Sequence, residues 1–408
     1  MNSEEILKLI KEDMENLIED RRYLHEHAEV GFELENTIAY VQKRLKEAGL
    51  KPERVGKAGI VATICGNPDG KVILLRADMD ALPIMEETGV EFACQNGKMH
   101  ACGHDMHTAM LLGAARFLAS HKDRINGTVK LLFQPAEELL EGAKDVIEAG
   151  VLKNPKVDAA MMLHVIPAMP FKAGNVIVAP AGVSAPAADY FTIEVQGKGC
   201  HGAMPVLGID PINIAAHIII SLQELHAREL AMGESSVLTI GKISSVETAV
   251  NVIPDKVILG GSMRAYDEQV REKIKTRLKE IAEKTAEVFR GSAEVKWGSG
   301  CPTLLNDEKL SFFLSDLQFK VSDDIMKKSA GETTKASGSE DFAYISHKVP
   351  SIMLAVAAGQ PEDGYKYPLH HPKVMFDEAA LPYGSTAYAY MAVKWLEAEK
   401  HMIGNKSE

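Results

Sequence analysis

Short apolar runs alternate with helical patterns along most of this 408-residue chain, and this alternation limits the folds it can adopt. The apolar runs are 72–75, 129–133, 159–163 and 351–356, and a clear helical pattern between them covers 106–120. Apolar runs of this length are typical of strands buried on both faces. The order of strands and helices therefore predicts an α/β fold with a mostly parallel sheet and helices on both faces.

The segment from about 187 to 298 has a different pattern. It predicts a half-exposed strand at 190–195, a helix at about 210–230, two strands, a long helix and a final strand. The order β-α-β-β-α-β is that of a ferredoxin-like α+β domain. Because the chain is too long for one ordinary core, we expect 187–298 to be inserted into a larger domain made of 1–186 and 299–408.

Helices are also expected before the first strand. Asn2 can cap an opening helix, with Glu5 three residues later. The apolar face of this helix consists of Ile6, Ile10, Met14 and Leu17. A second helix is expected over about 35–48, ending at Gly49.

Charge and composition exclude several classes of function. The net charge of −12 argues against nucleic acid or an anionic membrane surface as the main partner. No run approaches the roughly 18 apolar residues of a membrane span. The N-terminus also lacks the basic and apolar regions of a signal peptide. The five cysteines are scattered and form no C-x-x-C pair, which favours a reduced cytoplasmic protein over a disulfide framework.

Side chains that bind transition metals are concentrated at residues 99–107, Met-His-Ala-Cys-Gly-His-Asp-Met-His, where a helix is about to start. Further candidates follow predicted strands or lie late in the chain: Asp78, Asp80, Glu137, Glu138, His164 and the pair His370-His371. Ligands of an open α/β sheet bind outside the carboxyl ends of its strands. We therefore expect these residues to converge with Cys102 and His104.

Each of these residues, taken alone, has a simpler explanation. A single buried cysteine is usually an inert apolar residue. Glu137-Glu138 alone would be a solvated turn, Asp78 and Asp80 alone would be caps, and His164 alone could be a packed core histidine. Their coincidence at one predicted sheet edge favours a metal site. Other residues lack such support and are interpreted as surface, packing or structural residues: His25, His27, His217, His226, His401, Cys65, Cys94 and Cys301.

The adjacent pair Glu137-Glu138 suits a hydrolytic reaction. One carboxylate can bind metal while its neighbour takes a proton from a metal-bound water, whose pKa the metal lowers from about 15.7 to about 7. The same carboxyl group can then pass the proton to a leaving nitrogen. This arrangement predicts cleavage of an amide or a similarly resistant bond. The sequence contains no phosphate-cradling Gly-rich loop and no nucleophilic serine elbow.

Six motifs, in order along nearly the whole chain, carry a resemblance to a known family. They are Arg76-Ala77-Asp78-Met79-Asp80-Ala81-Leu82-Pro83, His100-Ala101-Cys102-Gly103-His104-Asp105, Gln134-Pro135-Ala136-Glu137-Glu138, Leu163-His164-Val165, Gly338-Ser339-Glu340-Asp341-Phe342 and Leu369-His370-His371-Pro372. The chain resembles the metallopeptidase family of aminoacylase, carboxypeptidase G and hippurate hydrolase. Within that family it is most similar to the amidohydrolase branch of bacterial N-acyl-amino-acid hydrolases and plant auxin-conjugate hydrolases.

The resemblance implies a site for two divalent metal ions. Its ligands would be Cys102, His104, Glu138, His164 and His370. Glu137 would be the general base, Asp80 would orient a metal-binding group, and Asp78 would lie behind the ligands. One thiolate with imidazoles and carboxylates is compatible with zinc, manganese, cobalt or nickel.

The resemblance also assigns roles to the inserted domain, as a lid and a dimerisation domain. His201, within Gly199–Pro205, would help to stabilise the tetrahedral oxyanion, in one arrangement across a dimer. Asn251 and Arg264 would hold the carboxylate of the substrate, although either alone would more often be structural. A homodimer or higher homo-oligomer is expected.

The resulting hypothesis is a cytoplasmic, metal-dependent amidohydrolase that cleaves N-acyl-L-amino acids into a carboxylic acid and a free amino acid. A dipeptidase, or a deacetylase of an intermediate such as N-acetyl-diaminopimelate, is an alternative with the same chemistry. A non-enzymatic metal or thiol sensor that uses Cys102 is an alternative of a different class. A panel of acetyl, benzoyl and aminoacyl substrates separates the enzymes, and the sensor would show no hydrolysis with metal restored.

Overall fold

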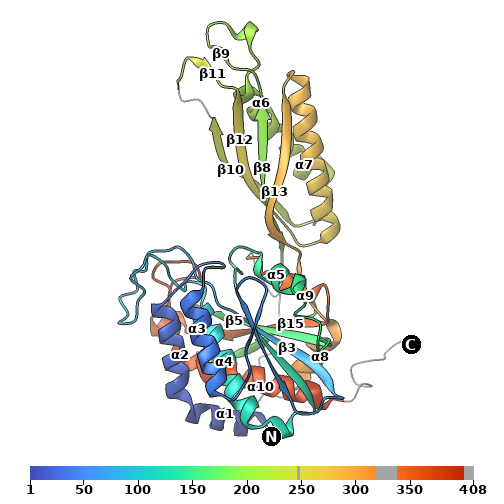
Figure 1. Ribbon diagram of the computed structural model, residues 1–408. Coiled ribbons are helices and arrows are strands. Elements are labelled where there is room, and N and C mark those ends of the chain that lie inside the picture. Colours follow the sequence, from blue (N-terminus) through green and yellow to red (C-terminus); the bar gives the residue numbers. More distant parts are fainter. Residues whose placement is uncertain (246–248, 318–337, 399–408) are drawn as a thin grey trace, which may run out of the picture. The chain divides into compact units, whose positions relative to one another are not determined.

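The computed structural model describes residues 1–245, 249–317 and 338–398 (Figure 1). These residues form two compact units. Of the described residues, the first unit contains 1–184, 305–317 and 341–398. The second unit contains the described residues of 185–304 and residues 338–340.

The first unit is built on a seven-stranded sheet. In spatial order its strands are β1 (Glu53–Val55), β2 (Gly59–Cys65), β4 (Gly127–Gln134), β3 (Lys71–Asp78), β5 (Ala159–Ile166), β15 (Ser351–Ala357) and β6 (Val176–Val178). The central strands β4, β3, β5 and β15 are parallel, and the strands outside them pair antiparallel. The parallel strands are those predicted from the apolar runs, so the predicted α/β class with a mostly parallel sheet is confirmed.

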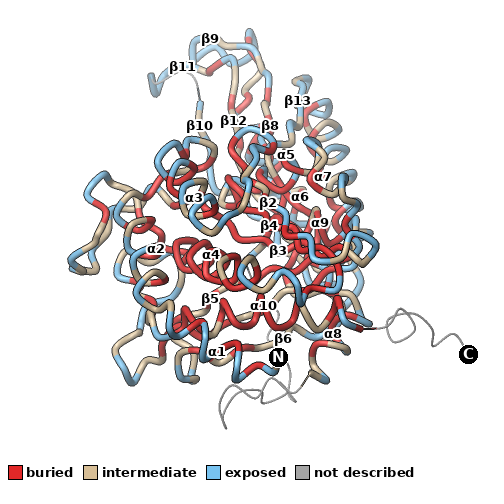
Figure 2. Tube along the Cα trace, turned by 60° about the horizontal axis from the view of Figure 1, so that its bottom comes forward, coloured by how far each residue is buried: buried red, intermediate tan, exposed pale blue. Residues whose placement is uncertain are grey.

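Helices cover this sheet. α4 (His104–Ser120) and α10 (Leu381–Glu397) pack against β3 and against each other, and α1 (Ser3–Glu12) and α2 (Met14–Glu26) pack against both. Because the sheet and neighbouring helices surround α4, it is apolar on nearly all sides, and its trace in Figure 2 is red over most of its length. The other helices of this unit are α3 (Glu35–Glu47), α5 (Gly142–Glu148), α8 (Glu308–Asp316) and α9 (Ala343–Ser346).

The N-terminal segment differs from its prediction in one respect. The capping box is present, with the Asn2 side chain accepting from the Glu5 amide at 2.9 Å. However, the expected single helix is wrong, because α1 ends at Glu12 and α2 begins at Met14. Asp13 lies between them, and its carboxylate accepts from Asn16 at 2.6 Å and from Arg116 of α4 at 2.5 Å. These contacts redirect the chain between the two helices.

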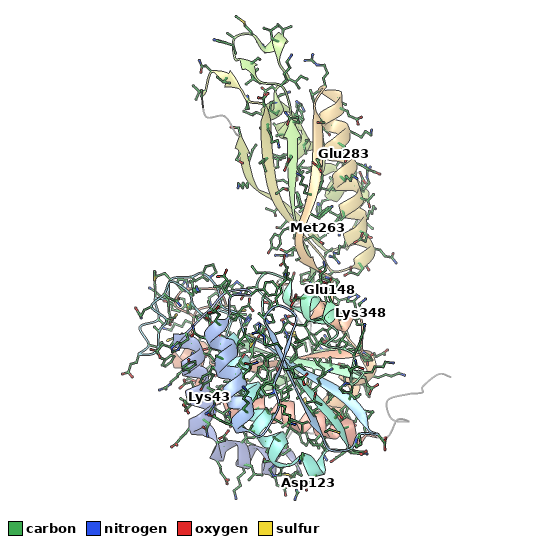
Figure 3. The ribbon with its side chains drawn as sticks, viewed as in Figure 1. Lys43, Asp123, Glu148, Met263, Glu283 and Lys348 are labelled. Atoms are coloured by element: carbon green, nitrogen blue, oxygen red, sulfur yellow. The ribbon has the colours of Figure 1, made fainter. Side chains whose placement is uncertain are left out.

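The second unit has a four-stranded antiparallel sheet in the order β10 (Ser236–Ser245), β12 (Lys256–Ala265), β8 (Ala187–Gln196) and β13 (Ser292–Cys301). α6 (Pro211–Glu224) and α7 (Glu268–Val288) pack on this sheet and supply its core. This strand order is that of the ferredoxin-like arrangement predicted from the sequence. Met263 of β12, labelled in Figure 3, is fully buried in this core, whereas Glu283 on α7 is partly exposed.

Smaller elements complete both units. β9 (Cys200–His201) pairs with β11 (Val252–Ile253), and β7 (Gly182–Ala185) pairs with β14 (Leu304–Asn306). Short 3₁₀ turns occur at Lys122–Arg124, Pro205–Leu207, Pro361–Asp363 and Glu378–Ala380. Among the described residues, no helix combines the length and the apolar character needed to span a lipid bilayer.

Candidate active site

The predicted metal-binding residues of the first unit lie at one edge of its sheet. Asp78 is the last residue of β3 and is aligned with Gln134, the last residue of the parallel strand β4. His164 lies near the end of β5, which is also parallel to β3. The carboxyl ends of these strands therefore bring together side chains that are far apart in the sequence.

Cys102 and His104 are placed by a left-handed glycine between them. Gly103 is the N-cap residue of α4 and has a φ of 83°. A Cβ at this position would lie 2.4 Å from the Val165 side chain, so only glycine fits without displacement. His370 also has a positive φ, 65°, and its amide donates to the Ala101 carbonyl at 2.9 Å. This hydrogen bond holds a strained residue beside the cysteine.

The predicted ligand atoms form one cluster. The Cys102 sulfur lies 3.5 Å from His164 Nε2 and 3.3 Å from His370 Nε2. Glu138 Oε1 lies 3.5 Å from His370 Nε2 and 3.9 Å from His104 Nε2. Cys102 belongs to two groups of three residues, and within each group the candidate ligand atoms lie within 4.8 Å of one another. They are Cys102, His104 and His164, and Cys102, Glu138 and His370. The cluster thus offers two adjacent cation positions with a common thiolate.

Two atoms of this cluster fit a bound cation. In the part of the chain that the structure describes, His104 Nε2 and Glu138 Oε1 are buried and have no hydrogen-bond partner. Each unpaired buried polar atom costs about 1–3 kcal/mol. His104 Nδ1 donates to the Asp80 carbonyl at 2.8 Å, and His164 Nδ1 donates to the Val165 carbonyl at 2.8 Å. Both histidines therefore present an Nε2 lone pair to the cluster when neutral, as metal-binding histidines do.

The charges of the cluster depend on one another. Burial and the Glu138 carboxylate raise the pKa of Cys102, but the imidazoles of His164 and His104 outweigh them and lower it to about 6. Burial lowers the pKa of His164, but the Cys102 thiolate raises it to about 9. Contacts with the Cys102 sulfur and the Glu138 carboxylate raise the pKa of His370 to about 10. The thiol is thus held as the thiolate, which is the form that binds metal.

Asp80 holds the Glu137-Glu138 turn. Its two carboxylate oxygens accept from the Glu137 amide at 3.0 Å and from the Glu138 amide at 3.2 Å. Glu137 is buried, with one oxygen 4.0 Å from His104 Nε2 and the other accepting from the Asp341 amide at 3.4 Å. Asp80 therefore orients His104 through its carbonyl and both glutamates through its carboxylate.

Both carboxylate oxygens of Asp78 accept hydrogen bonds from residues behind the cluster. Its oxygens accept from Arg76 at 2.7 Å and from His107 Nδ1 at 2.6 Å. Burial raises the pKa of Asp78, but His104, Arg76 and His107 together hold it well below its ordinary value. His107 Nε2 accepts from the Val165 amide at 2.8 Å. Sequence reasoning missed His107, although its spacing of three from His104 places both on one face of α4.

Comparison with known proteins identifies the family. Residues 74–394 match the model of Peptidase family M20/M25/M40. The chain belongs to this peptidase family. The resemblance inferred from the six motifs is confirmed, and so is the prediction that the chain is a hydrolase.

Two curated enzymes are among the relatives of this chain. An N-acetyl-L-cysteine deacetylase of Bacillus subtilis (strain 168) is 39% identical over 367 residues, which cover 90% of this chain and 84% of the relative. The IAA-amino acid hydrolase ILR1-like 2 of Arabidopsis thaliana is 37% identical over 406 residues, covering 96% and 87%. A crystal structure from Bacillus subtilis, described as a dinuclear metal binding peptidase from the M20 family, has a TM-score of 0.78 at 33% identity. It covers 95% of this chain and 100% of that one.

Two histidines of the first unit have partners that the sequence did not indicate. His25, interpreted from the sequence as a surface or packing residue, is 2% exposed and contacts the carboxylates of Asp105 and Glu86. His371, next to His370, stacks on Tyr367 instead of joining the cluster. Only His370 of this pair therefore contributes to the candidate metal site.

The second unit carries the remaining predicted residues. His201 is exposed on β9, and its Nδ1 accepts from the Ala203 amide at 3.0 Å. Asn251 precedes β11, and its carbonyl accepts from the Gly202 amide at 2.8 Å. Arg264 on β12 donates to the Tyr190 hydroxyl at 3.3 Å, and its Nη1 is buried without a partner among the described residues. Their roles toward a substrate stay predictions.

Proposed function

We propose that this protein is a metal-dependent amidohydrolase that cleaves N-acyl-L-amino acids into a carboxylic acid and a free amino acid. The observation that carries the proposal is a pair of buried atoms, His104 Nε2 and Glu138 Oε1, that have no hydrogen bond among the described residues and lie beside the Cys102 sulfur. The names of two relatives support the substrate class, since one deacetylates N-acetyl-L-cysteine and the other hydrolyses an IAA-amino acid.

The proposed ligands of two divalent cations are Cys102, His104, Glu138, His164 and His370. Their mixture of thiolate, imidazole and carboxylate favours zinc or manganese and also admits cobalt or nickel. Cations held there would supply Lewis acidity, which makes an amide carbonyl more electrophilic and a water more acidic. A free thiol at the centre of the site is the basis for proposing a cytoplasmic, reducing location.

Glu137 is the proposed general base. Asp80 holds the backbone amide of Glu137, and the Asp341 amide donates to its carboxylate, whose other oxygen lies 4.0 Å from His104 Nε2. From there it takes a proton from the attacking water and delivers that proton to the leaving nitrogen of the amide. Glu138 differs in belonging to the group of ligand atoms that contains the Cys102 sulfur and His370.

The second unit is the proposed lid and dimerisation domain. In this proposal His201 stabilises the oxyanion, and Asn251 and Arg264 bind the carboxylate of the amino acid. Support for self-association comes from large apolar side chains that this unit exposes, including Val206 and Leu207 beside β9 and Val237 on the edge strand β10. The mass of the protein in solution tests this part of the proposal, and a monomer at all concentrations would contradict it.

The change Glu137→Gln tests the proposed mechanism. The amide keeps the size of the side chain but cannot take a proton, so we expect turnover of N-acyl amino acids to fall by about 10²–10⁴-fold. The content of bound metal should be unchanged in elemental analysis. The control is Glu141→Gln, an exposed glutamate four residues on, which should retain wild-type turnover. Unimpaired turnover in Glu137→Gln would remove this residue from the mechanism.

A panel of substrates tests the reaction itself. N-acetyl, N-benzoyl and aminoacyl derivatives of several L-amino acids should be offered to the metal-loaded protein. The proposal expects release of the free amino acid from the acetyl or benzoyl compounds. Preference for aminoacyl compounds would indicate a dipeptidase instead, and no hydrolysis of any compound would contradict the proposed enzyme.

A further inference from the structure

A chain of buried charges lies behind the candidate metal site in the first unit. His25 of α2 is 2% exposed, and its Nδ1 lies 2.8 Å from Asp105 Oδ2. Its Nε2 lies 3.1 Å from Glu86 Oε1. The Arg21 guanidinium, one turn earlier on α2, donates to the same oxygen of Asp105 at 2.9 Å. Charges of opposite sign thus alternate from Glu86 through His25 and Asp105 to Arg21.

Asp105 connects this chain of charges to the candidate ligands. It directly follows His104 in the first turn of α4, and it is fully buried. A carboxylate at this position is also favoured by the positive end of the helix dipole. Because His25 and Arg21 both donate to Asp105 Oδ2, they fix the first turn of α4 against α2. The orientation of His104 depends on that turn.

The second contact of His25 fixes a neighbouring loop. Glu86 accepts from the Cys94 amide at 3.1 Å, which closes the loop between them. Phe92 of this loop meets the His25 ring edge-on, with centroids 5.4 Å apart. A cavity of about 240 Å³ lies beside this arrangement and is lined by residues that include His25, Glu86 and Phe92. His25 of α2 therefore contacts both α4 and this loop.

The two hydrogen bonds define the charge of the imidazole. Each ring nitrogen of His25 faces a carboxylate oxygen, so each must carry a proton to donate. Burial lowers the pKa of His25, but the hydrogen bonds to Asp105 and Glu86 outweigh it and raise the pKa. The other charged or titratable groups nearby are Arg21 on the same helix and His100, whose ring centroid is 6.3 Å away.

We propose that His25 is a positioning residue for the metal site, acting through Asp105 on His104. This inference rests on the metal site of the proposed function, and it goes beyond it by assigning a role to a residue that touches neither ligand nor substrate. The contact with Asp105 transmits the effect, whereas the contact with Glu86 orders the loop. Partners behind a metal ligand typically change metal affinity by about 10–100-fold when they are removed.

Two substitutions of His25 separate these contacts. The amide nitrogen of asparagine occupies about the place of Nδ1, so His25→Asn keeps a donor toward Asp105. The amide nitrogen of glutamine occupies about the place of Nε2, so His25→Gln keeps a donor toward Glu86. The matched control is His27→Gln, at the residue that directly follows α2, because His27 contacts the Tyr23 carbonyl and not Asp105.

Metal binding to the metal-free protein, measured by calorimetric titration with Zn²⁺, is the first readout. We expect His25→Gln to weaken binding by about tenfold or more, and His25→Asn by less than about threefold. His27→Gln should bind as the wild type does. A role in packing alone predicts the opposite order, because glutamine fills the space of histidine better than asparagine. Wild-type binding in His25→Gln, or equal losses in both variants, would overturn the inference.

Hydrogen exchange of the metal-free protein is the second readout. Amides of residues 99–110 should exchange faster in His25→Gln than in the wild type, and His25→Asn should restore protection. This readout does not depend on catalysis. A wild-type protein that binds Zn²⁺ but hydrolyses no N-acyl amino acid would contradict the proposed function and leave the role of His25 intact. Unchanged exchange in His25→Gln would contradict the role of His25 alone.

Discussion

At the scale of single residues, backbone groups decide where the imidazoles of the site carry their protons. The carbonyls of Asp80 and Val165 accept from Nδ1 of His104 and His164, so that Nε2 of each offers an electron pair when the ring is neutral. The Val165 amide donates to Nε2 of His107, so the proton of that ring faces Asp78 instead. His104, His164 and His107 thus take different roles, because one hydrogen bond from or to the backbone decides which ring nitrogen carries the proton.

The thiol of Cys102 should titrate at an unusually low pH in the metal-free protein. Its pKa is lowered to about 6, so the thiolate should be present above that pH and disappear as the pH falls through it. Ultraviolet absorbance of the thiolate, recorded against pH for the wild type minus Cys102→Ser, measures this directly. A difference signal that appears only near pH 8.5, the ordinary value for a thiol, would contradict the described electrostatics.

Residue types and strand ends were sufficient to predict that the candidate ligands converge, but not which residues support them. Cys102, Glu138 and His164 could be proposed because metal-binding side chains followed predicted strands or opened a helix. His25 and His107 could not be distinguished from packed core histidines, because their significance depends on partners such as Asp105 and Asp78 that lie 80 and 29 residues away. Single-residue patterns carry no information about such pairs.

At the scale of elements, the start of α4 is the feature on which the cluster depends. Gly103 turns the chain so that Cys102 and His104, on either side of it, both belong to the cluster of candidate ligands. The change Gly103→Ala imposes a left-handed alanine and a Cβ 2.4 Å from Val165. We expect it to lower the free energy of unfolding of the metal-free protein by about 2–5 kcal/mol and to reduce metal binding.

The control for this substitution is Gly89→Ala. Gly89 has a φ of 76°, close to that of Gly103, but a Cβ there would meet no atom within 4 Å. Only the backbone cost of about 1–2 kcal/mol should therefore appear in denaturant unfolding. If Gly103→Ala were no less stable than Gly89→Ala, close packing at the start of α4 would not be the reason for glycine.

The ends of helices are where sequence prediction and structure differ most. α3 was expected to end at about residue 48 and does end at Glu47, because its amphipathic pattern and Gly49 agree. In contrast, the predicted helix at 210–230 is regular only to Glu224 and then becomes a π-helical turn. Arg277 of α7 binds Glu229 in this turn through two hydrogen bonds, at 2.6 and 2.8 Å. A contact between helices has overridden the local pattern there.

At the scale of the whole molecule, the buried guanidinium of Arg76 joins three of the six motifs that carry the resemblance. Arg76 is fully buried and donates to Gln134 at 3.0 Å, to Asp78 at 2.7 Å and to Asp341 at 2.9 Å. Asp341 also accepts from Gln134 at 2.7 Å. The order of motifs along the chain was readable from the sequence, but this network was not. Burying a charge is costly without several partners, so these motifs must fold together.

We propose that distant segments of this chain hold two divalent cations, at which the protein hydrolyses N-acyl amino acids. The most direct measurement is the rate of amino acid release by the metal-free protein, with N-acetyl and N-benzoyl amino acids, as Mn²⁺ or Zn²⁺ is added stepwise. We expect no hydrolysis without metal, and a rate that saturates when about two equivalents of metal ion per chain have been added, as in a dinuclear site. Hydrolysis that is unaffected by metal, or none at any metal content, would contradict it.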